Sequence, residues 1–297
     1  MDGTVAAFRA GSALSRVLPA AVTDSVAERS ARLMARRSSP RRAQVERNLR
    51  RVYGDIGANA LDRAVAETFA SYGRYYAESL RLPSLDVAAI DAGFTQEGFD
   101  NIVTAVESGT GPILVLPHLG SWEWAGFWLT AVQHLEVTAV VEPLEPPELF
   151  DWFASFREKL GMHVLSLESP SIGGALLAAI RDGHVVCLLS DRLVGGAGVE
   201  VEFFGERTML PAGPATLALR TGAVLLPTAV YQRPKGTHAV CRPPVEAERR
   251  GKLRADVQRV TQALADELET LIRAAPEQWH LMQPNWPSDN GHPHQGY

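Results

Sequence analysis

The residues of this chain best placed to do chemistry are His118 and Glu123, in the segment HLGSWE. His118 directly follows PILVLP (112–117), an apolar run typical of a buried strand. Five residues of ideal helix turn through ~500°, which would separate the two side chains. They can meet only if His118 lies in a turn and Glu123 in the first turn of the next helix. Gly120 and Ser121 are suitable turn and N-cap residues for that arrangement.

In that geometry the carboxylate accepts the proton on one imidazole nitrogen and fixes the tautomer in which the other nitrogen is a base. Such a base can take a proton from a substrate alcohol as the alcohol attacks an activated acyl carbonyl. No serine or cysteine nucleophile is then required. A His and a Glu this close also occur by chance, but a position at a strand end is typical of ligand sites in α/β sheets.

Further candidates are charged residues downstream of His118. Asp191 follows the apolar run HVVCLLS (184–190) and could line a site or cap the structure. Arg157 and Arg192 could anchor phosphate bidentately on an acyl carrier or a lipid headgroup. The alternatives are a surface helix charge for Arg157 and an ion pair for Arg192. The segment PAGPA (211–215) could start a helix whose first N–H groups hold an anion, or be a simple turn.

The elements that must position these residues alternate between strands and helices from about residue 100 onward. The expected strands are near-continuous apolar runs at 112–117, 136–141, 163–167, 184–190, 199–204 and 223–231. Helical spacing of apolar residues predicts helices over 60–82 and 254–275. The pattern indicates an α/β fold, with a central, mostly buried mixed sheet flanked by helices on both faces.

We expect one domain over 1–297, since the chain has neither a linker nor a repeat. It would comprise basic N-terminal helices (1–59), an α/β catalytic core (60–286) and a flexible tail (287–297). The N-terminal helices are expected over 5–22 and 24–37, the second capped by Asp24.

Charge is unevenly distributed along the chain. The net charge is −5, yet residues 1–60 hold eleven arginines against five acids, so that the rest of the chain carries −11. Arg29, Arg32 and Arg36 share one predicted helix face, which is either solvated or attracted to anionic lipid headgroups. Nucleic acid is disfavoured, because no aromatic platform accompanies the arginines and the body is acidic.

No apolar stretch reaches the ~18–20 residues of a membrane-spanning helix, and the N-terminus lacks the apolar region of a signal peptide. We therefore expect a peripheral protein on the cytoplasmic face of the cell membrane. The two cysteines, Cys187 and Cys241, match no metal-ligand spacing. The histidines form no zinc motif either, so the sequence predicts no metal site and no cofactor.

Aromatic residues near the predicted site leave two interpretations open. Trp122, Trp124 and Trp128 could anchor the protein at a membrane interface or line an acyl pocket. Three apolar residues of the segment FFGERTM could form the wall of an acyl tunnel, although core packing is the simpler interpretation; they are Phe203, Phe204 and Met209.

The motifs together support a family resemblance. HLGSWE resembles the H-x4-D/E signature of the glycerolipid acyltransferase superfamily. FREKLGMHVL, CLLSDR and GVEVEFFGERTMLPAGPATLALRTGAVLLP resemble its lipid A-type (lauroyl/myristoyl) acyltransferase branch in order and spacing. Within that branch the phosphatidylinositol mannoside acyltransferases are most similar, and QVERNLRRVYG and WHLMQPNW also fit them. The resemblance covers roughly residues 40–286.

The resemblance implies that His118 is the general base, that Glu123 is its orienting partner, and that Arg157 and Asp191 have roles in the site. The signature more often has Asp where this chain has Glu123. Related enzymes usually have Glu where it has Asp191, and the resemblance implies that this acid lies near the catalytic base. It also suggests a mannose of a phosphatidylinositol mannoside-type glycolipid as the acceptor. We expect acyl-CoA as the donor substrate, and the basic N-terminal section leads us to expect an anionic membrane surface as a partner.

Two rival functions stay open at this stage. The chain could be a lipid A-type acyltransferase that uses an acyl carrier protein as donor. It could also be a non-catalytic lipid-binding protein that keeps the fold, although the intact His118 and Glu123 argue against this.

Overall fold

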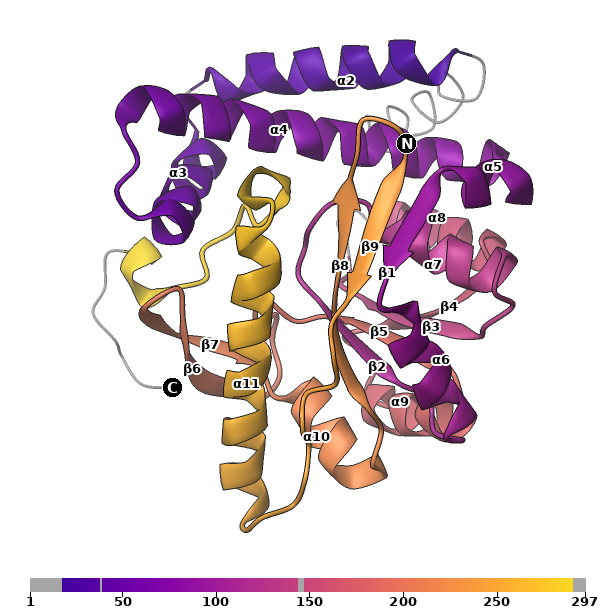
Figure 1. The fold of residues 1–297 in the computed structure, drawn as a ribbon. Helices are drawn as coiled ribbons and strands as arrows, with labels where there is room; N and C mark the ends of the chain where they lie inside the picture. The colour runs from indigo at the N-terminus through magenta and orange to yellow at the C-terminus, as the bar shows by residue number, and fades with distance from the viewer. Residues whose placement is uncertain (1–17, 38, 144–146, 291–297) are drawn as a thin grey trace.

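The computed structural model describes residues 18–37, 39–143 and 147–290, and a seven-stranded sheet forms its centre (Figure 1). The strand order is β1-β9-β8-β2-β5-β3-β4, and every neighbouring pair is parallel except β8 and β9. The strands of this sheet are β1 (Phe94–Glu97), β2 (Ile113–Leu116), β3 (Val137–Val141), β4 (Met162–Ser166), β5 (Val185–Leu189), β8 (Leu225–Gln232) and β9 (Thr237–Cys241).

Helices cover both faces of the sheet (Figure 1). The α-helices are α2 (Ala20–Ala35), α3 (Pro40–Tyr53), α4 (Ala58–Arg81), α5 (Val87–Ala92), α6 (Phe99–Glu107), α7 (Trp122–Ala131), α8 (Pro147–Lys159), α9 (Ile172–Arg181), α10 (Gly213–Thr221) and α11 (Leu253–Arg273). Short 3-10 helices are η1 (Leu82–Ser84), η2 (Pro276–Gln278) and η3 (Pro287–Asn290). The expected mixed α/β fold with an N-terminal helical section is confirmed.

Alternate side chains of β2 pack into two hydrophobic cores on opposite faces of the sheet. Ile113 and Val115 face the core beneath α9, α10 and α11, whereas Leu114 and Leu116 face the core beneath α6 and α7. All four are at most 5% exposed. A strand buried on both faces reads as a continuous apolar run, which is why this sheet could be predicted.

The N-terminal helices form a third small core that lies on α4. Val45, Leu49, Val65 and Phe69 are buried in it. Helix α2 begins at Ala20 rather than at the expected Asp24 cap, and the Asp24 carboxylate instead accepts a hydrogen bond from Arg81 at 2.9 Å. Most of the expected helix over 5–22 lies outside the described residues.

The two long predicted helices are confirmed as α4 and α11, but one predicted strand has a different place. The run at 199–204 is not part of the central sheet: it forms β6 (Gly198–Phe203), which pairs only with β7 (Glu206–Pro211) in an antiparallel hairpin. In the described part of the chain, no helix is long and apolar enough to cross a membrane.

Candidate active site

His118 lies directly beyond the carboxyl end of β2, and its partner is Asp191. The imidazole Nδ1 lies 2.6 Å from Asp191 Oδ1, and the backbone N–H of His118 donates to Asp191 Oδ2 at 3.1 Å. Asp191 follows the neighbouring parallel strand β5, so the two strand ends bring the pair together. Asp191 is fully buried while the His118 side chain is 31% exposed. This arrangement leaves Nε2 without a hydrogen bond from any described residue.

Two C-terminal residues hold Asp191 in place. The indole N–H of Trp279 donates to Asp191 Oδ2 at 2.7 Å, and the Asn285 side-chain amide donates to the Asp191 carbonyl at 2.9 Å. Burial alone would raise the pKa of the Asp191 carboxyl, but the charge and hydrogen bonds of His118 and the Trp279 hydrogen bond outweigh it and lower the pKa. Asp191 is therefore an ionised carboxylate with its orientation fixed by several donors.

Glu123 does not accept the imidazole proton, in contrast to the sequence-based expectation. Its Oε1 accepts hydrogen bonds from Arg157 at 2.9 Å and from the Tyr75 hydroxyl at 2.7 Å. Burial, and next the charge of Glu123, raises the pKa of Tyr75 well above its ordinary value, so the phenol remains a donor. Glu123 lies in the first turn of α7 as predicted. Its carboxylate, however, pairs with Arg157, and the partner of His118 is Asp191.

Arg157 is buried rather than a surface charge, and it borders a cavity. Its guanidinium lies 5.0 Å from the centre of the Trp122 ring and 5.5 Å from that of Phe153. Glu123 Oε2 and Arg157 Nε are buried without a hydrogen-bond partner among the described residues. A buried ion pair with spare hydrogen-bonding capacity beside a cavity is a plain candidate for a substrate contact.

The turn between His118 and α7 requires its glycine. Gly120 has a φ of 61°, and a Cβ there would lie 1.8 Å from the Val230 carbonyl oxygen. Ser121 is the residue before α7, but its hydroxyl makes no cap hydrogen bond. It donates instead to the buried Glu78 carboxylate at 2.5 Å. Burial raises the pKa of Glu78, and its ion pair with Arg74 only partly offsets that effect.

The C-terminal segment 276–286 clamps the same turn. The His280 N–H donates to the His118 carbonyl at 2.7 Å, and the Gly120 N–H donates to the Gln278 carbonyl at 3.0 Å. The His280 side chain is partly buried, and desolvation, followed by the nearby His118 charge, lowers the pKa of its ring to about 3. Its Nε2 lies 2.8 Å from the Ser71 hydroxyl of α4. The roles of Trp279, Asn285 and His280 were missed from the sequence, where only the motif WHLMQPNW pointed to this segment.

A cavity of about 760 Å³ opens beside His118, Trp122 and Arg157. It lies at the carboxyl ends of β2, β3 and β5, and tyrosines of α4 form part of its wall. Helix α4 crosses this end of the sheet (Figure 1). Aliphatic side chains form much of the remaining wall, among them Val140, Leu167, Leu176, Leu177, Leu188, Leu189, Leu193 and Leu217. Its size and apolar lining are those of a small-molecule or acyl-chain site.

The other predicted site residues have mixed outcomes. Arg192 borders the cavity and forms an ion pair with Glu142 at 2.6 Å. Trp122 borders the cavity too. Trp124 and Trp128 are only 6% exposed, and their indole N–H groups bond Ile90 and Asp91, which excludes a membrane-anchoring role in this conformation.

Core packing is the correct interpretation for two of the tunnel candidates. Phe203 and Phe204 are buried in the core with Trp279 and Trp286, and neither lines the cavity. Met209 is also not among the residues that line the cavity.

With this geometry established, comparison with known proteins identifies the family. The sequence pattern of the family described as bacterial lipid A biosynthesis acyltransferase matches residues 4–288. The chain belongs to this family. It is therefore an acyltransferase, and the match spans every element that builds the site.

Curated relatives of this acyltransferase carry a narrower name. The chain is 36% identical over 285 residues to the phosphatidylinositol mannoside acyltransferase of Mycolicibacterium smegmatis, covering 95% of this chain and 91% of the relative. It is 38% identical over 288 residues to the phosphatidylinositol mannoside acyltransferase of Mycobacterium tuberculosis, covering 95% of this chain and 88% of the relative. The resemblance inferred from the motifs is confirmed.

Proposed function

We propose that this acyltransferase moves a long-chain fatty acyl group from acyl-CoA to a mannose hydroxyl of a phosphatidylinositol mannoside, by direct attack without an acyl-enzyme. The observation that carries the proposal is the His118–Asp191 pair, which opens on an apolar cavity at the carboxyl ends of the strands. The name of the mycobacterial relatives supports the choice of acceptor.

In the proposed reaction, His118 Nε2 accepts the proton of the acceptor hydroxyl as the oxygen attacks the thioester carbonyl. Asp191 holds the Nδ1 proton and stabilises the imidazolium that forms. When the tetrahedral intermediate collapses, the bond from carbon to sulfur breaks and the leaving thiolate takes the proton from Nε2. Glu123 keeps Arg157 at the cavity wall, where its positive charge can bind a phosphate or the developing oxyanion.

Basic groups at the rim of the cavity are an argument for a donor substrate that carries phosphates, as acyl-CoA does. Arg192 and Arg220 border the cavity, and Arg220 is exposed. The start of α10, at Gly213 and Pro214, also borders it. Guanidinium groups and a helix N-terminus both favour phosphate oxygens. The aliphatic wall would then accommodate the acyl chain.

Helix α2 supports attachment to a membrane surface. Val22, Val26 and Leu33 are 45%, 59% and 58% exposed, and their spacing places them on one face of the helix. The opposite face meets α4 closely, because a Cβ at Gly73 would lie 2.9 Å from the Ala31 Cβ. An exposed apolar stripe accompanied by exposed basic residues is typical of a helix that lies on a membrane surface.

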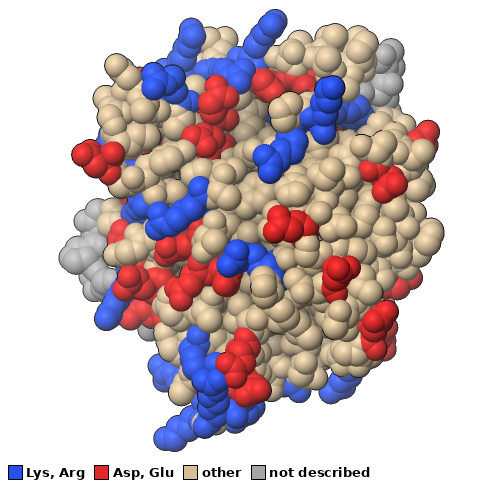
Figure 2. Space-filling view, in the orientation of Figure 1, with Lys and Arg blue, Asp and Glu red and all other residues tan. Residues whose placement is uncertain are grey.

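Basic side chains accompany this stripe. Figure 2 shows Lys and Arg side chains projecting outward at the end of the molecule formed by the N-terminal helices, with acidic side chains between them. Arg29 and Arg36 of this region are exposed, whereas Arg32 is held in ion pairs with Glu28 and Glu67. We propose that this end faces anionic lipid on the cytoplasmic side of the cell membrane.

The purified enzyme tests the proposal directly. We expect it to acylate a phosphatidylinositol mannoside in mixed vesicles with palmitoyl-CoA as donor, with the product detected by mass spectrometry. Palmitoyl-acyl carrier protein at the same concentration serves as the competing donor. Faster transfer from the carrier protein would refute the donor assignment, and a stable acyl adduct formed with acyl-CoA alone would refute direct attack. Lipid binding without transfer from either donor would favour a non-catalytic protein.

A further inference from the structure

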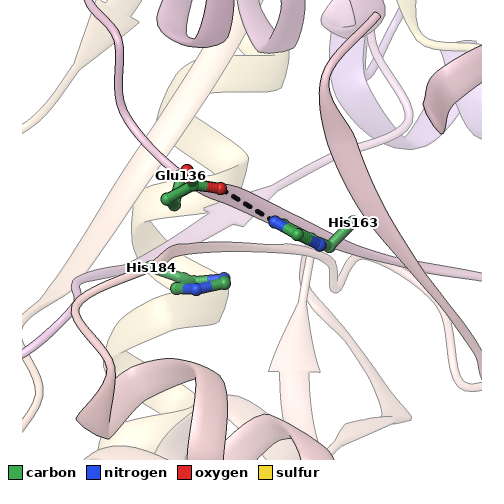
Figure 3. Close-up of side chains that lie close together, drawn as sticks. All are labelled: Glu136, His163 and His184. Carbon is green, nitrogen blue, oxygen red and sulfur yellow. Dashed lines mark hydrogen bonds and ion pairs between the residues drawn. The ribbon is translucent and has the colours of Figure 1, made fainter. Parts of the chain in front are cut away.

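Three potential metal ligands meet near the amino ends of β3, β4 and β5, at the end of the sheet opposite the active site. Glu136, His163 and His184 each offer a ligand atom, and these atoms all lie within 4.8 Å of one another. Figure 3 shows the three side chains gathered beside the strands, with the Glu136 carboxylate directed at the His163 ring. In the described part of the chain, no other group of three such side chains has this proximity.

The sheet register brings these residues together. Glu136 and His184 immediately precede β3 and β5, and His163 is the second residue of β4. The Glu136 carbonyl accepts a hydrogen bond from the N–H of Val185 at 2.8 Å. The sequence separations match no zinc motif because each ligand comes from a different strand, which explains why sequence spacing predicted no metal site.

The side chains are already partly arranged for coordination. His163 Nε2 lies 2.8 Å from Glu136 Oε2, and the rings of His163 and His184 have centres 4.9 Å apart. His184 Nδ1 lies 2.9 Å from the Thr138 hydroxyl. When Nδ1 donates to that hydroxyl, the lone pair of Nε2 is left for a metal. A hydrogen bond on the second ring nitrogen is the usual support of a metal-binding histidine.

We propose that Glu136, His163 and His184 form a binding site for a divalent transition-metal ion of the zinc class. Two imidazoles and one carboxylate suit Zn²⁺ and its neighbours, whereas Mg²⁺ and Ca²⁺ prefer oxygen ligands alone. Water completes the tetrahedron, because Glu136 and His163 are exposed. The ion replaces the hydrogen bond between these two side chains, whose exposed ends need only small rotations to reach ~2.0–2.2 Å from it.

The site joins strands and takes no part in the transfer reaction. It ties β5 and β3 to β4, the edge strand of the sheet. His184 precedes β5 and Asp191 follows it, so roughly 20 Å of extended chain separates the metal from the His118–Asp191 pair. We therefore expect the bound metal to change the stability of the fold and not the rate of acyl transfer. A test of metal binding is independent of the proposed substrate.

The experiment is a metal titration of the metal-stripped, tag-free full-length protein. We expect Co²⁺ to give the visible absorption of a tetrahedral complex, saturating at one equivalent, and Zn²⁺ to displace it. At 100 times Kd, Zn²⁺ should raise Tm by about 5 °C. His163→Ala and His184→Ala should each abolish the absorption band and the Tm shift. His238→Ala, which removes a histidine from β9, should retain both.

The controls separate loss of ligands from loss of fold. The metal-free Tm and the circular dichroism of both ligand variants should match those of the wild type, and their transfer activity should be unchanged. The proposal is overturned if the wild type shows no saturable Co²⁺ band. It is equally overturned if the band survives in either ligand variant, which would show that the replaced histidine is not a ligand.

Discussion

Replacing Asp191 with asparagine removes the negative charge beside the His118 ring and changes which atom faces Nδ1. Asp191 Oδ2 accepts hydrogen bonds from the His118 backbone N–H and from the Trp279 indole, so this position requires an oxygen. The side-chain amide of Asp191→Asn must therefore present its NH2 group to His118 Nδ1. That nitrogen becomes an acceptor, the proton moves to Nε2, and the base is lost. Loss of a positioned general base costs roughly 10²- to 10⁴-fold in kcat, or about 3 to 5 kcal/mol of transition-state stabilisation.

Glu123→Gln is the matched control for this prediction. Glu123 Oε1 accepts from both Tyr75 and Arg157, and a glutamine oxygen can accept both hydrogen bonds as well. We expect kcat to fall less than roughly tenfold, with a larger effect on KM or Tm, because the Arg157 charge loses its counter-ion. Steady-state kinetics on both variants decide between the two carboxylates. A larger fall in kcat for Glu123→Gln than for Asp191→Asn would refute the assignment.

Three further predictions concern the membrane face, the C-terminal clamp and the turn. Replacing Val22, Val26 and Leu33 together with serine should weaken binding to anionic vesicles at least roughly tenfold in a flotation assay, with kcat on detergent-dispersed lipid unchanged; unchanged flotation would exclude α2 as the contact. The pKa of His280 is depressed to about 3, so its contribution to stability is present above pH 6.5 and is lost as the pH falls. Between pH 8 and pH 5, the free energy of unfolding should drop by about 2 kcal/mol more in the wild type than in His280→Gln. Equal dependence of the unfolding free energy on pH in the two proteins, measured by denaturant titration, would contradict this. Gly120→Ala should abolish activity and lower Tm, because its Cβ would lie 1.8 Å from a carbonyl oxygen; near-normal transfer would mean that the turn can move.

The fold could be predicted where one physical signal dominates. The continuous apolar runs of β2, β3, β5 and β8 mark strands buried on both faces, and long amphipathic helices such as α4 have a clear period. The run that forms β6, VEVEFF (199–204), alternates Val with Glu, a pattern typical of a strand with one exposed face. Its pairing with β7, rather than with a strand of the central sheet, depends on tertiary contacts that the composition of the run does not reveal. Likewise β1 and β9 are short and partly exposed, so their sequences lack a distinctive pattern.

The site residues could be named from the sequence, but not all their partners. His118 and Glu123 are five residues apart, and this closeness favoured a pairing between them. His118 instead pairs with Asp191, because the parallel neighbouring strands β2 and β5 end side by side. Such a contact depends on strand order, which the sequence leaves open. The same is true of Trp279, which reaches Asp191 from the far end of the chain.

The most direct test of the account is acyl transfer by His118→Ala, measured together with lipid binding. The imidazole is the proposed base, and its side chain is 31% exposed, so removing it should leave the fold and the cavity intact. We predict that transfer from palmitoyl-CoA to a phosphatidylinositol mannoside falls at least roughly 10²-fold while vesicle binding and Tm stay near their wild-type values. Transfer at a rate near that of the wild type would contradict the central claim.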